Sequence, residues 1–384
     1  MQAISWNANG LCSHLPELLI FLENLHTTPD FICIQETKLY NELLPNIPGY
    51  NYTHCFRNKK QGGGSAIYIK SNVCFFPINF PIITDIDIEV AGIQFIDKNS
   101  LEITLLSVCI APGQTLTSAH LDKLLISKNL IIVGDLNAKH KIWGSPINDF
   151  RGKTIERFLE NNNLVCLNKG DPTRIHYNGT VSHLDLIVSS KNLAFKIECD
   201  VINDIWGSDH YPLHISYNEC IVKTEINLNK FNYKKANWTS FQDSLSDPNN
   251  YTLPLVDAKT GYEELVSAYR RAREASIPLQ KGIFKHKYSP YWSTDCGIAK
   301  SEKKNAEKAL RKNKTIENQI NFKKCKAKFK YVLGLAKKQY WNIFCSSLNH
   351  QTKLKHVWDT VAKLKGTTIK REIVIKDENG ILGY

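Results

Sequence analysis

The sequence predicts a layered α/β domain with β-sheets packed together, followed by a basic and mainly helical extension. Short runs rich in Ile, Val, Leu and Phe alternate with helical patterns over residues 1–217. Several of these runs end in polar clusters, as strands do where they reach the edge of a sheet. After residue 218 the strand pattern stops and lysine-rich helical periodicity begins. Mixed strands and helices of this kind suit a layered core.

Seven strands are expected in the first part of the chain from their β-branched and aromatic content. They cover residues 3–6, 31–35, 65–70, 101–110, 130–134, 184–188 and 213–217. The spacing of apolar residues predicts helices over residues 15–25, 118–125 and 153–161. Three consecutive glycines, residues 62–64, predict a turn into the third of these strands. They lack the Gly-Lys-Ser/Thr ending of a P-loop, so no phosphate cradle is expected there.

Charge divides the chain into two parts. Residues 1–218 hold 17 Lys and Arg against 21 Asp and Glu, a net charge of −4. Residues 219–384 hold 32 against 16, a net charge of +16. A basic part joined to a mildly acidic part indicates an enzyme with a nucleic-acid-binding extension. A highly charged, solvated helix is the alternative.

The organisation expected from these patterns has three segments. They are an α/β domain over residues 1–218, a polar and Asn-rich linker over residues 219–260, and basic helices over residues 261–384. Residues 300–338 carry 14 Lys and Arg against three Glu. Apolar spacing in this stretch predicts one buried stripe with lysines on the other faces. The stripe consists of Phe322, Cys325, Phe329, Val332 and Ala336.

Cysteine usage favours an intracellular, reducing compartment. The 11 cysteines are scattered, and none forms a Cys-x-x-Cys pair or a zinc-finger spacing. We therefore expect buried, inert thiols and neither a disulfide framework nor a zinc site. The sequence has no apolar run of 18 residues, so we expect no contact with a membrane through a spanning helix.

The cluster Ser208-Asp209-His210 is the most informative motif, because four other polar clusters precede it at the ends of apolar runs. Those four are Ser5-Trp6-Asn7-Ala8-Asn9-Gly10, Gln35-Glu36-Thr37-Lys38, Gly134-Asp135-Leu136-Asn137 and Ser182-His183-Leu184-Asp185. Together they supply a metal-binding carboxylate, a histidine with an acidic partner, and groups that hold a phosphate and a water. These are the parts needed to hydrolyse a phosphodiester with a divalent cation.

His210 is the candidate catalytic base. An imidazole takes a proton from water near neutral pH when an acid fixes its other nitrogen. Asp185, on a separate strand, is the candidate for that acid. The alternative for an isolated Ser-Asp-His is a turn with a capping Asp, but the four further clusters favour catalysis.

Glu36 is the candidate metal ligand, since it follows an apolar strand and its carboxylate would lie at the strand end. Mg²⁺ is bound through one or two carboxylates and keeps its other positions for water and phosphate oxygens. Asp209 supplies a second carboxylate, and the Asn9 amide is a candidate neutral ligand. An ordinary surface Glu is the alternative for Glu36 taken alone.

Asp135 and Asn137 follow a strongly apolar strand, and alternation places both side chains on one side of its end. An Asp there can orient the attacking water, and an Asn amide can donate to a phosphate oxygen that gains charge. Asn7 at the end of the first strand is a candidate to hold His210 or the phosphate. An Asx-turn after a buried strand is the alternative for Asp135 and Asn137.

These five motifs, in this order over residues 5–212, resemble the endonuclease/exonuclease/phosphatase family. Within it they are most similar to the apurinic-type endonuclease domains of non-LTR retrotransposons. The segment from Gly134 to Ser145, followed by Arg151-Gly152, resembles the Jockey-like branch. The resemblance implies a four-layer, DNase I-like α/β sandwich. It also implies Mg²⁺-dependent nicking of DNA, with Mn²⁺ as the alternative metal, that leaves a 3′-hydroxyl for reverse transcription.

The resemblance also implies roles for individual residues. Glu36 would bind the metal, and Asn7 and Asn137 would hold active-site groups. Asp135 would handle the nucleophile or the leaving group. His210 would meet the phosphate, either as a base or as a stabilising donor. Its helpers are Asp185 and Asp209, and Ser208 beside them would contact the substrate.

One position departs from the family pattern. The family has a tyrosine in the strand before a proline, and in this sequence Cys109 stands there, three residues before Pro112. A thiol is a weak donor and is shorter than a phenol. Losing such a donor costs on the order of 10²-fold in rate. A catalytically inactive, nucleic-acid-binding remnant of a mobile element therefore stays open as an alternative. So does a sibling activity, either abasic-site repair or a phosphoesterase.

Two further regions bear on partners. In the loop 171–181, Arg174 and Tyr177 are the candidates for base contacts in a DNA groove. The region after residue 218 resembles the connector that precedes a reverse transcriptase, and the sequence has no Tyr/Phe-x-Asp-Asp signature. Its basic helices would contact element RNA or target DNA. Action on chromosomal DNA implies a nuclear location.

Overall fold

The computed structural model describes most of the chain as two compact units. The described residues are 1–39, 44–56, 62–78, 80, 86, 88–223, 235–247, 258–278, 290–349, 352, 354–365, 375–377 and 380–382. One unit comprises residues 1–224 and 286–384, and the other comprises residues 225–285. Residues 224–234 and 248–257 of the expected linker lie outside the described part, and the boundaries expected at 218 and 260 stay predictions.

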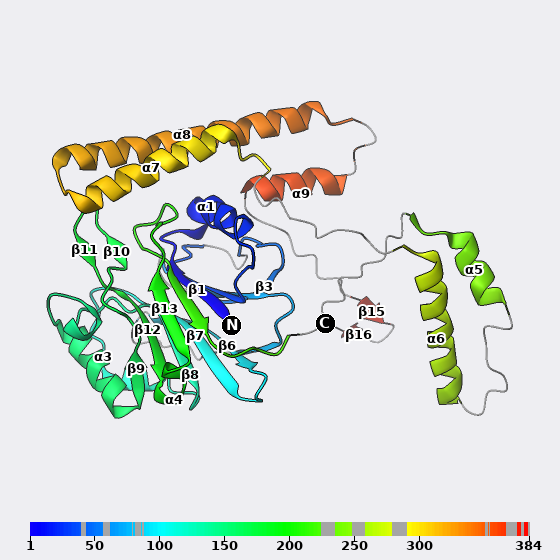
Figure 1. Ribbon diagram of the computed structural model, residues 1–384, viewed down its shortest axis with the longest axis horizontal. Helices are drawn as coiled ribbons and strands as arrows, with labels where there is room; N and C mark the ends of the chain where they lie inside the picture. Colours follow the sequence, from blue (N-terminus) through cyan, green and yellow to red (C-terminus); the bar gives the residue numbers. More distant parts are fainter. Residues whose placement is uncertain are drawn as a thin grey trace. The chain divides into compact units, whose positions relative to one another are not determined.

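Two six-stranded sheets form the centre of the first unit (Figure 1). The first sheet has the order β13-β14-β1-β2-β4-β3. Its strands are β1 (Gln2–Asn7), β2 (Phe31–Gln35), β3 (Tyr50–Cys55), β4 (Ser65–Lys70), β13 (Ile197–Val201) and β14 (Leu213–Tyr217). The central strands β1 and β2 are parallel, so both end at the same edge of the sheet.

The second sheet has the order β5-β6-β7-β8-β12-β9. Its strands are β5 (Phe75–Ile78), β6 (Ile88–Ile96), β7 (Glu102–Ile110), β8 (Leu130–Asp135), β9 (Leu164–Cys166) and β12 (Asp185–Ser190). Here β7 and β8 form the parallel pair. The inner faces of the two sheets share one apolar core, in which the rings of Phe31 and Phe95 lie 5.0 Å apart.

Helices cover the outer faces of both sheets. The helix α1 (Leu11–Glu23) buries Leu15, Leu18 and Leu22 against the first sheet. The helices α2 (Ser118–Asp122) and α3 (Phe150–Asn161) cover the second sheet in the same way. The succession helix, sheet, sheet, helix confirms the four-layer α/β sandwich. All seven expected strands and all three expected helices are present, with ends shifted by a few residues.

Short elements complete this unit. They are the 3₁₀ turn η1 (Lys141–Trp143), the hairpin of β10 (Arg174–Ile175) and β11 (Val181–Ser182), and α4 (Lys191–Ala194). The later part of the chain is mainly helical, as expected. It contains α5 (Trp238–Ser246), α6 (Ala258–Ser276), α7 (Thr294–Lys312), α8 (Ile316–Ser346) and α9 (Leu354–Lys365), followed by β15 (Ile375–Asp377) and β16 (Gly380–Leu382). None of the described helices has the length and apolarity that a bilayer span requires.

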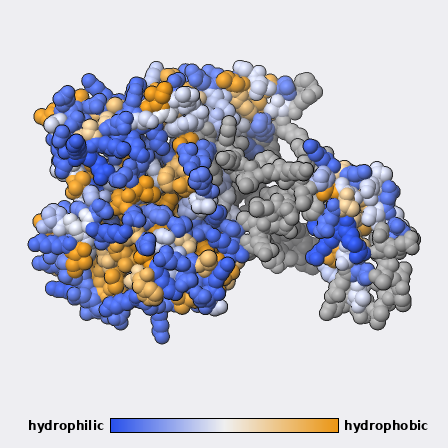
Figure 2. All heavy atoms as spheres, viewed as in Figure 1, coloured by the Kyte–Doolittle hydropathy of each residue, from blue (hydrophilic) through white to orange (hydrophobic). Residues whose placement is uncertain are grey.

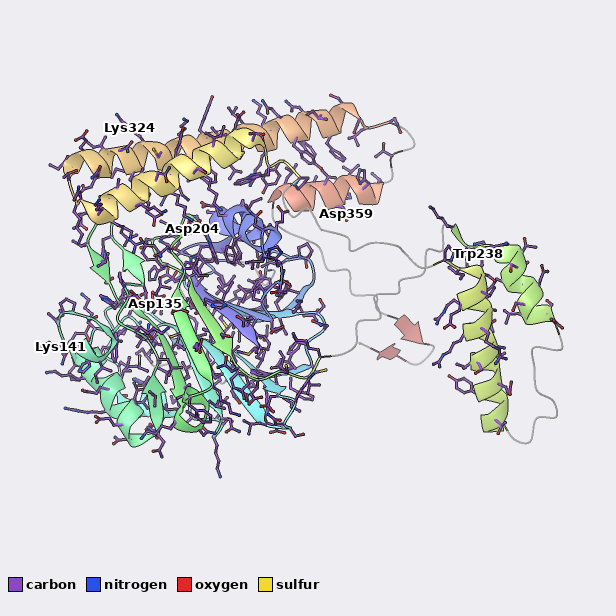
Figure 3. The ribbon with its side chains drawn as sticks, in the orientation of Figure 1. Asp135, Lys141, Asp204, Trp238, Lys324 and Asp359 are labelled. Atoms are coloured by element: carbon purple, nitrogen blue, oxygen red, sulfur yellow. The ribbon has the colours of Figure 1, made fainter. Side chains whose placement is uncertain are left out.

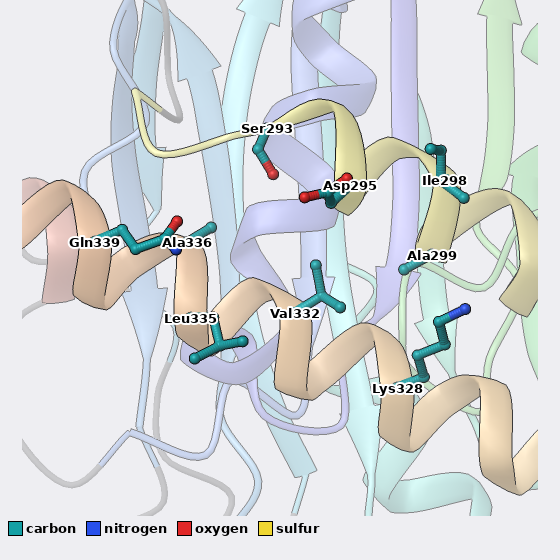
Figure 4. A pocket seen from close by; sticks show the side chains of 9 residues that line it. All are labelled: Ser293, Asp295, Ile298, Ala299, Lys328, Val332, Leu335, Ala336 and Gln339. Atoms are coloured by element: carbon teal, nitrogen blue, oxygen red, sulfur yellow. The ribbon is translucent and has the colours of Figure 1, made fainter.

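The helices α7 and α8 form an antiparallel hairpin. Between them lies a groove lined by Ile298 of α7 and by Val332 and Leu335 of α8, among others (Figure 4). In the expected stripe of α8, Phe329 and Ala336 are buried and the other three side chains are half-buried. Hydrophilic side chains predominate on the visible face of this helix (Figure 2), and Lys324 lies on its outer side (Figure 3).

Candidate active site

The polar clusters meet at one end of the two sheets, where strands from both sheets terminate. Asn7 ends β1 and pairs in register with Gln35, the last residue of β2. Asp135 ends β8 and pairs with Asp185, the first residue of the antiparallel neighbour β12. Asp135 lies at the end of the sandwich that faces α7 (Figure 3). The parallel pair β1–β2 and the antiparallel pair β8–β12 therefore bring motifs from distant parts of the chain to one place.

The fully buried amide of Asn7 joins the two sheets. Its Nδ2 donates to Asp135 Oδ2 at 2.8 Å and to Glu36 Oε1 at 3.3 Å. Its Oδ1 accepts from the backbone N–H of Asn9. Asn7 thus fixes the spacing between the carboxylates of Asp135 and Glu36.

His210 lies between two buried carboxylates. Its Nδ1 is 2.8 Å from Asp185 Oδ2, and its Nε2 faces Asp135 Oδ2 at 3.9 Å. The three side chains are at most 3% exposed. These three also form a group whose potential ligand atoms lie within 4.8 Å of one another. Because the Nδ1 of His210 already meets Asp185, we interpret the group as an oriented imidazole and not as a metal cage.

The electrostatics of this group follow from burial and from its like charges. Burial, together with the neighbouring Asp185 carboxylate, raises the pKa of Asp135 to about 7. For His210, burial lowers the pKa, but the charge of Asp185 and its hydrogen bond outweigh burial and raise the pKa to about 9. Asp185 thus favours the protonated form of His210, and burial next to Asp185 disfavours the ionised form of Asp135.

Asp209 is held by two partners. Arg174 donates from Nε at 2.9 Å and from Nη2 at 2.8 Å to Asp209 Oδ2, and Asn9 Nδ2 donates to Oδ1 at 2.8 Å. Burial raises the pKa of Asp209, but the charges of His210 and Arg174 outweigh it and lower the pKa below its ordinary value. Both oxygens of this expected metal ligand are directed at protein donors.

Glu36 and Asn9 converge on a cation, the ammonium group of Lys38. Lys38 Nζ lies 3.0 Å from Glu36 Oε2 and also donates to Asn9 Oδ1. The Glu36 side chain is 25% exposed, and its backbone lies in the left-handed region with a φ of +46°. Two hard oxygens that face a positive charge at a partly open position fit Mg²⁺ or Mn²⁺ and do not fit a soft metal.

Asn137 lies in an Asx-turn directly after the buried strand β8. Its backbone N–H donates to Asp135 Oδ1 at 3.0 Å, which is an Asx-turn, and its φ is +49°. Its side chain donates to the carbonyl of Ile110 at 3.1 Å, so it ties the end of β8 to the end of β7. Asn137 therefore forms this turn and also lies beside Asp135, so the turn does not exclude Asn137 from the site.

The expected substrate contacts differ in how they are engaged. Ser208 Oγ donates to the carbonyl of Asn7 at 2.8 Å and accepts from the backbone N–H of His210. Both hydrogen bonds are therefore made to the protein backbone. Arg174 is bound to Asp209, whereas Tyr177 is 78% exposed at the β10–β11 turn. Cys109 is buried on β7, directly opposite Asp135 in the parallel register.

Sequence reasoning missed two residues of the site. One is Lys38, which was visible in the Gln-Glu-Thr-Lys motif. The other is Arg151, which is buried and donates to the backbone carbonyls of Ala111, Gln114 and Leu136. It thereby fixes the segments that follow β7 and β8. The adjacent Gly152 leaves no room for a side chain, since a Cβ would lie 2.0 Å from the carbonyl oxygen of Lys139.

Comparison with known families agrees with this geometry. Residues 103–214 match the family model described as endonuclease-reverse transcriptase. This part of the chain is therefore similar to that family. The match covers Cys109, Asp135, Asn137, Asp185 and His210, and the resemblance to Jockey-like endonuclease domains is confirmed.

Proteins of mobile elements are among those similar to this chain. The RNA-directed DNA polymerase from mobile element jockey of Drosophila melanogaster is 26% identical over 283 residues, which are 72% of this chain and 30% of that protein. The probable RNA-directed DNA polymerase from transposon X-element of the same species is 26% identical over 267 residues, 67% of this chain and 28% of that protein. The chain thus spans less than a third of these curated relatives.

Two solved structures have a similar arrangement. The endonuclease domain of TRAS1, a telomere-specific non-LTR retrotransposon, has 23% sequence identity and a TM-score of 0.47, and the match covers 56% of this chain and 97% of that chain. The catalytic domain of Xenopus laevis APE2 has 16% identity and a TM-score of 0.46, with 59% and 94% covered.

Proposed function

We propose that this chain is a divalent-metal-dependent DNA endonuclease that nicks one strand of target DNA for retrotransposition. The observation that carries the proposal is the meeting of Asn7, Asp135, Asp185 and His210 at one end of the sandwich. The Glu36–Asn9 position lies beside it, linked through Asn7. A carboxylate for a metal, an oriented imidazole and a second buried carboxylate are groups that can support phosphodiester hydrolysis.

Glu36 and Asn9 would hold the metal ion, with Lys38 displaced from their oxygens. When bound, the ion would stabilise negative charge that develops on the phosphate. Asp209 keeps Asn9 in place through the bond from Asn9 Nδ2, which leaves Asn9 Oδ1 directed at the cation position. We therefore assign Asp209 a supporting role and expect Glu36 to be the principal ligand.

The protonation state of His210 decides between its two candidate roles, a base and a donor to the phosphate. With a pKa raised to about 9, His210 would donate to a phosphate oxygen and would not act as the base at neutral pH. Asp135, with a pKa raised to about 7, would accept a proton from the attacking water. Asp185 would keep the imidazole oriented and charged throughout.

Partners and location follow as further proposals. Exposed Tyr177 would contact the target DNA at the β10–β11 turn, next to Arg174. Lysines on the outer face of α8 would contact element RNA or DNA through phosphates, without reading sequence. Since the target is chromosomal DNA, we propose that the protein acts in the nucleus.

Nicking of supercoiled plasmid by the purified chain tests the function. We expect Mg²⁺ or Mn²⁺ to support conversion to the relaxed circle, and EDTA to prevent it. Glu36→Ala should abolish nicking, whereas Glu160→Ala, which removes an exposed carboxylate from α3, should not change the rate. Nicking that persists in Glu36→Ala would contradict the metal assignment.

A catalytically inactive nucleic-acid-binding protein is the second candidate, and Cys109 at the family's tyrosine position favours it. It predicts DNA binding without nicking under either metal. An oligonucleotide with one abasic site in the same assay distinguishes the repair-type sibling activity. Cleavage restricted to that site would favour this sibling over a target-DNA nickase.

A further inference from the structure

One face of α7 is directed at the loop that carries the catalytic residues. Lys303, Glu307 and Arg311 are spaced one helical turn apart, so their side chains lie in one row along the helix. Each of the three contacts the segment between residues 203 and 211 or a side chain packed against it. This segment contains Asp209 and His210.

The first contact is a buried ion pair. Lys303 Nζ lies 2.7 Å from Glu17 Oε2 and 2.8 Å from Oε1, and both side chains are almost fully buried. Glu17 in turn lies against Gly207, where an added Cβ would be 2.7 Å from Glu17 Oε1. Lys303 therefore fixes the side chain that packs on the middle of the loop.

The second and third contacts hold Tyr211, the residue after His210. The Tyr211 hydroxyl donates to Glu307 Oε1 at 3.0 Å within a buried environment. The guanidinium of Arg311 lies 4.8 Å from the centre of the Tyr211 ring and also donates to Asn203 Oδ1 at 3.1 Å. Arg311 thus joins both ends of the loop.

The helix α8 makes a matching contact with the hairpin beside the loop. Phe322 packs against an apolar cluster formed by Ile175, Ile205 and Tyr211. Gln319 Nε2 donates to the carbonyl of Asn178 at 3.1 Å, in the β10–β11 turn. That hairpin bonds the catalytic loop directly, because the backbone N–H of Ile175 donates to the carbonyl of Asp209 at 2.9 Å.

The loop itself has a backbone that needs such support. Trp206 has a φ of +48° and Gly207 a φ of +87°. A bulky residue in the left-handed region is strained, and it persists only where its surroundings over-determine it. Trp206 is fully buried, with its ring 5.2 Å from that of Trp6 and 4.5 Å from that of Phe21.

We infer that the α7–α8 hairpin is an integral part of the nuclease and that Glu307 and Arg311 are positioning residues for Asp209 and His210. They act through Tyr211 and Asn203 and touch neither the phosphate nor the metal. The inference rests on the proposed function. It means that the inner face of this basic hairpin packs against the rest of the nuclease, so that only its outer faces are open to nucleic acid.

Steady-state nicking by the full chain tests the inference. Glu307→Leu and Tyr211→Phe each remove the hydroxyl–carboxylate contact, and we expect kcat to fall by about tenfold or more with little change in KM. Glu307→Gln keeps an oxygen that accepts from Tyr211 and should restore at least half of the rate. The matched control is Glu302→Gln, which removes a carboxylate of α7 that pairs with Lys328 inside the hairpin, and it should leave kcat unchanged.

A second readout does not depend on activity. The N–H proton of the His210 imidazole that faces Asp185 should shift or broaden in the NMR spectrum of Tyr211→Phe and stay unmoved in Glu302→Gln. If the wild type nicks no DNA, the proposed function fails and this resonance alone decides the inference. Should Glu307→Leu fail to fold, Tyr211→Phe tests the same contact with the loss of one atom. A rate equal to that of Glu302→Gln, or an unmoved resonance in Tyr211→Phe, overturns the inference.

Discussion

Lys303 Nζ and Glu17 Oε2 lie 2.7 Å apart, with side-chain exposures of 1% and 5%, although 286 residues separate them in the chain. Both charges of this deeply buried pair are costly to desolvate. Loss of either partner would therefore leave the other charge buried without compensation. It links α1, which covers the first sheet, to α7 of the basic extension. The extension is thereby joined to the α/β sandwich through a contact that cannot be opened without exposing or stranding a charge.

Removing one partner of this pair should be strongly destabilising. Glu17→Ala leaves the Lys303 ammonium buried without its counter-charge, and we expect the free energy of unfolding to fall by about 3–5 kcal/mol. The double variant Glu17→Leu with Lys303→Met should recover most of that loss, because no charge is left buried. Urea unfolding followed by circular dichroism measures both. The exposed pair Lys328–Glu302 is the control, and its loss should cost less than about 1 kcal/mol.

Glu307 gives the stability a pH dependence. Burial raises its pKa to about 7 from an ordinary value of 4.5, against the opposing effects of Tyr211, Lys303 and Arg311 and with support from Asp204. A carboxyl with a raised pKa binds its proton more tightly in the folded state. Its contribution is therefore complete below about pH 4.5 and is lost as the pH rises through about 7.

We therefore expect the urea midpoint of the wild type to fall more between pH 5 and pH 8 than that of Glu307→Gln. The amide does not titrate, so it removes this part of the pH dependence and keeps the acceptor for Tyr211. Parallel curves for the two proteins over this range would show that Glu307 is ionised throughout.

Gly134 is a position where backbone approach determines the site. Its φ is +139°, and an added Cβ would lie 2.0 Å from the carbonyl oxygen of Val108 on β7. Gly134→Ala should push β8 away from β7, displace the adjacent Asp135, and destabilise the protein by more than about 1 kcal/mol. Gly297→Ala is the matched control, because that glycine lies in α7 with open space around it. It should stabilise the protein by about 0.5 kcal/mol, as measured by urea unfolding.

Much of the sandwich could be predicted because its central strands are continuous apolar runs that end in polar clusters. The strands β9, β10 and β11 have only two or three residues each, too few for a periodic signal. The docking of α7 was not predicted either. Lys303, Glu307 and Arg311 look like a solvated charged face, and only their partners Glu17 and Tyr211, which are far away in sequence, show that the face is buried.

In the site, the sequence indicated which residues meet but not which hydrogen bonds they make. Strand-end position was enough to place Asn7 and Asp135 at one edge, and the Ser208-Asp209-His210 motif indicated His210. The contact of Arg174 with Asp209 depends on the placement of the β10–β11 hairpin, which no local pattern encodes. The ion pair of Lys38 with Glu36 depends on a left-handed backbone at both residues, which is unusual for Glu and Lys.

The charge of Asp185 should matter for the rate and not for DNA binding. Asp185→Asn removes the carboxylate that lies 2.8 Å from His210 Nδ1, so the imidazole loses both its proton at neutral pH and its fixed orientation. We expect kcat for plasmid nicking to fall by about 10²-fold or more with an unchanged KM. The control Asp200→Asn removes an exposed carboxylate that pairs with Lys169. A rate for Asp185→Asn within a few-fold of this control would contradict the role given to His210.

One experiment at Cys109 distinguishes an active endonuclease from an inactive nucleic-acid-binding protein. Its backbone lies opposite Asp135 in the β7–β8 register, where the family places a tyrosine. If the domain is active but lacks one phosphate donor, Cys109→Tyr should raise the nicking rate by roughly tenfold. Cys109→Ala, which adds no donor, should not raise it, and thermal melts should verify that the larger side chain is tolerated at this buried position. His210→Ala should remove nicking in either background. An unchanged rate in a folded Cys109→Tyr protein would show that Cys109 does not face the phosphate. If neither protein nicks DNA with Mg²⁺ or Mn²⁺, the chain is the inactive nucleic-acid-binding form.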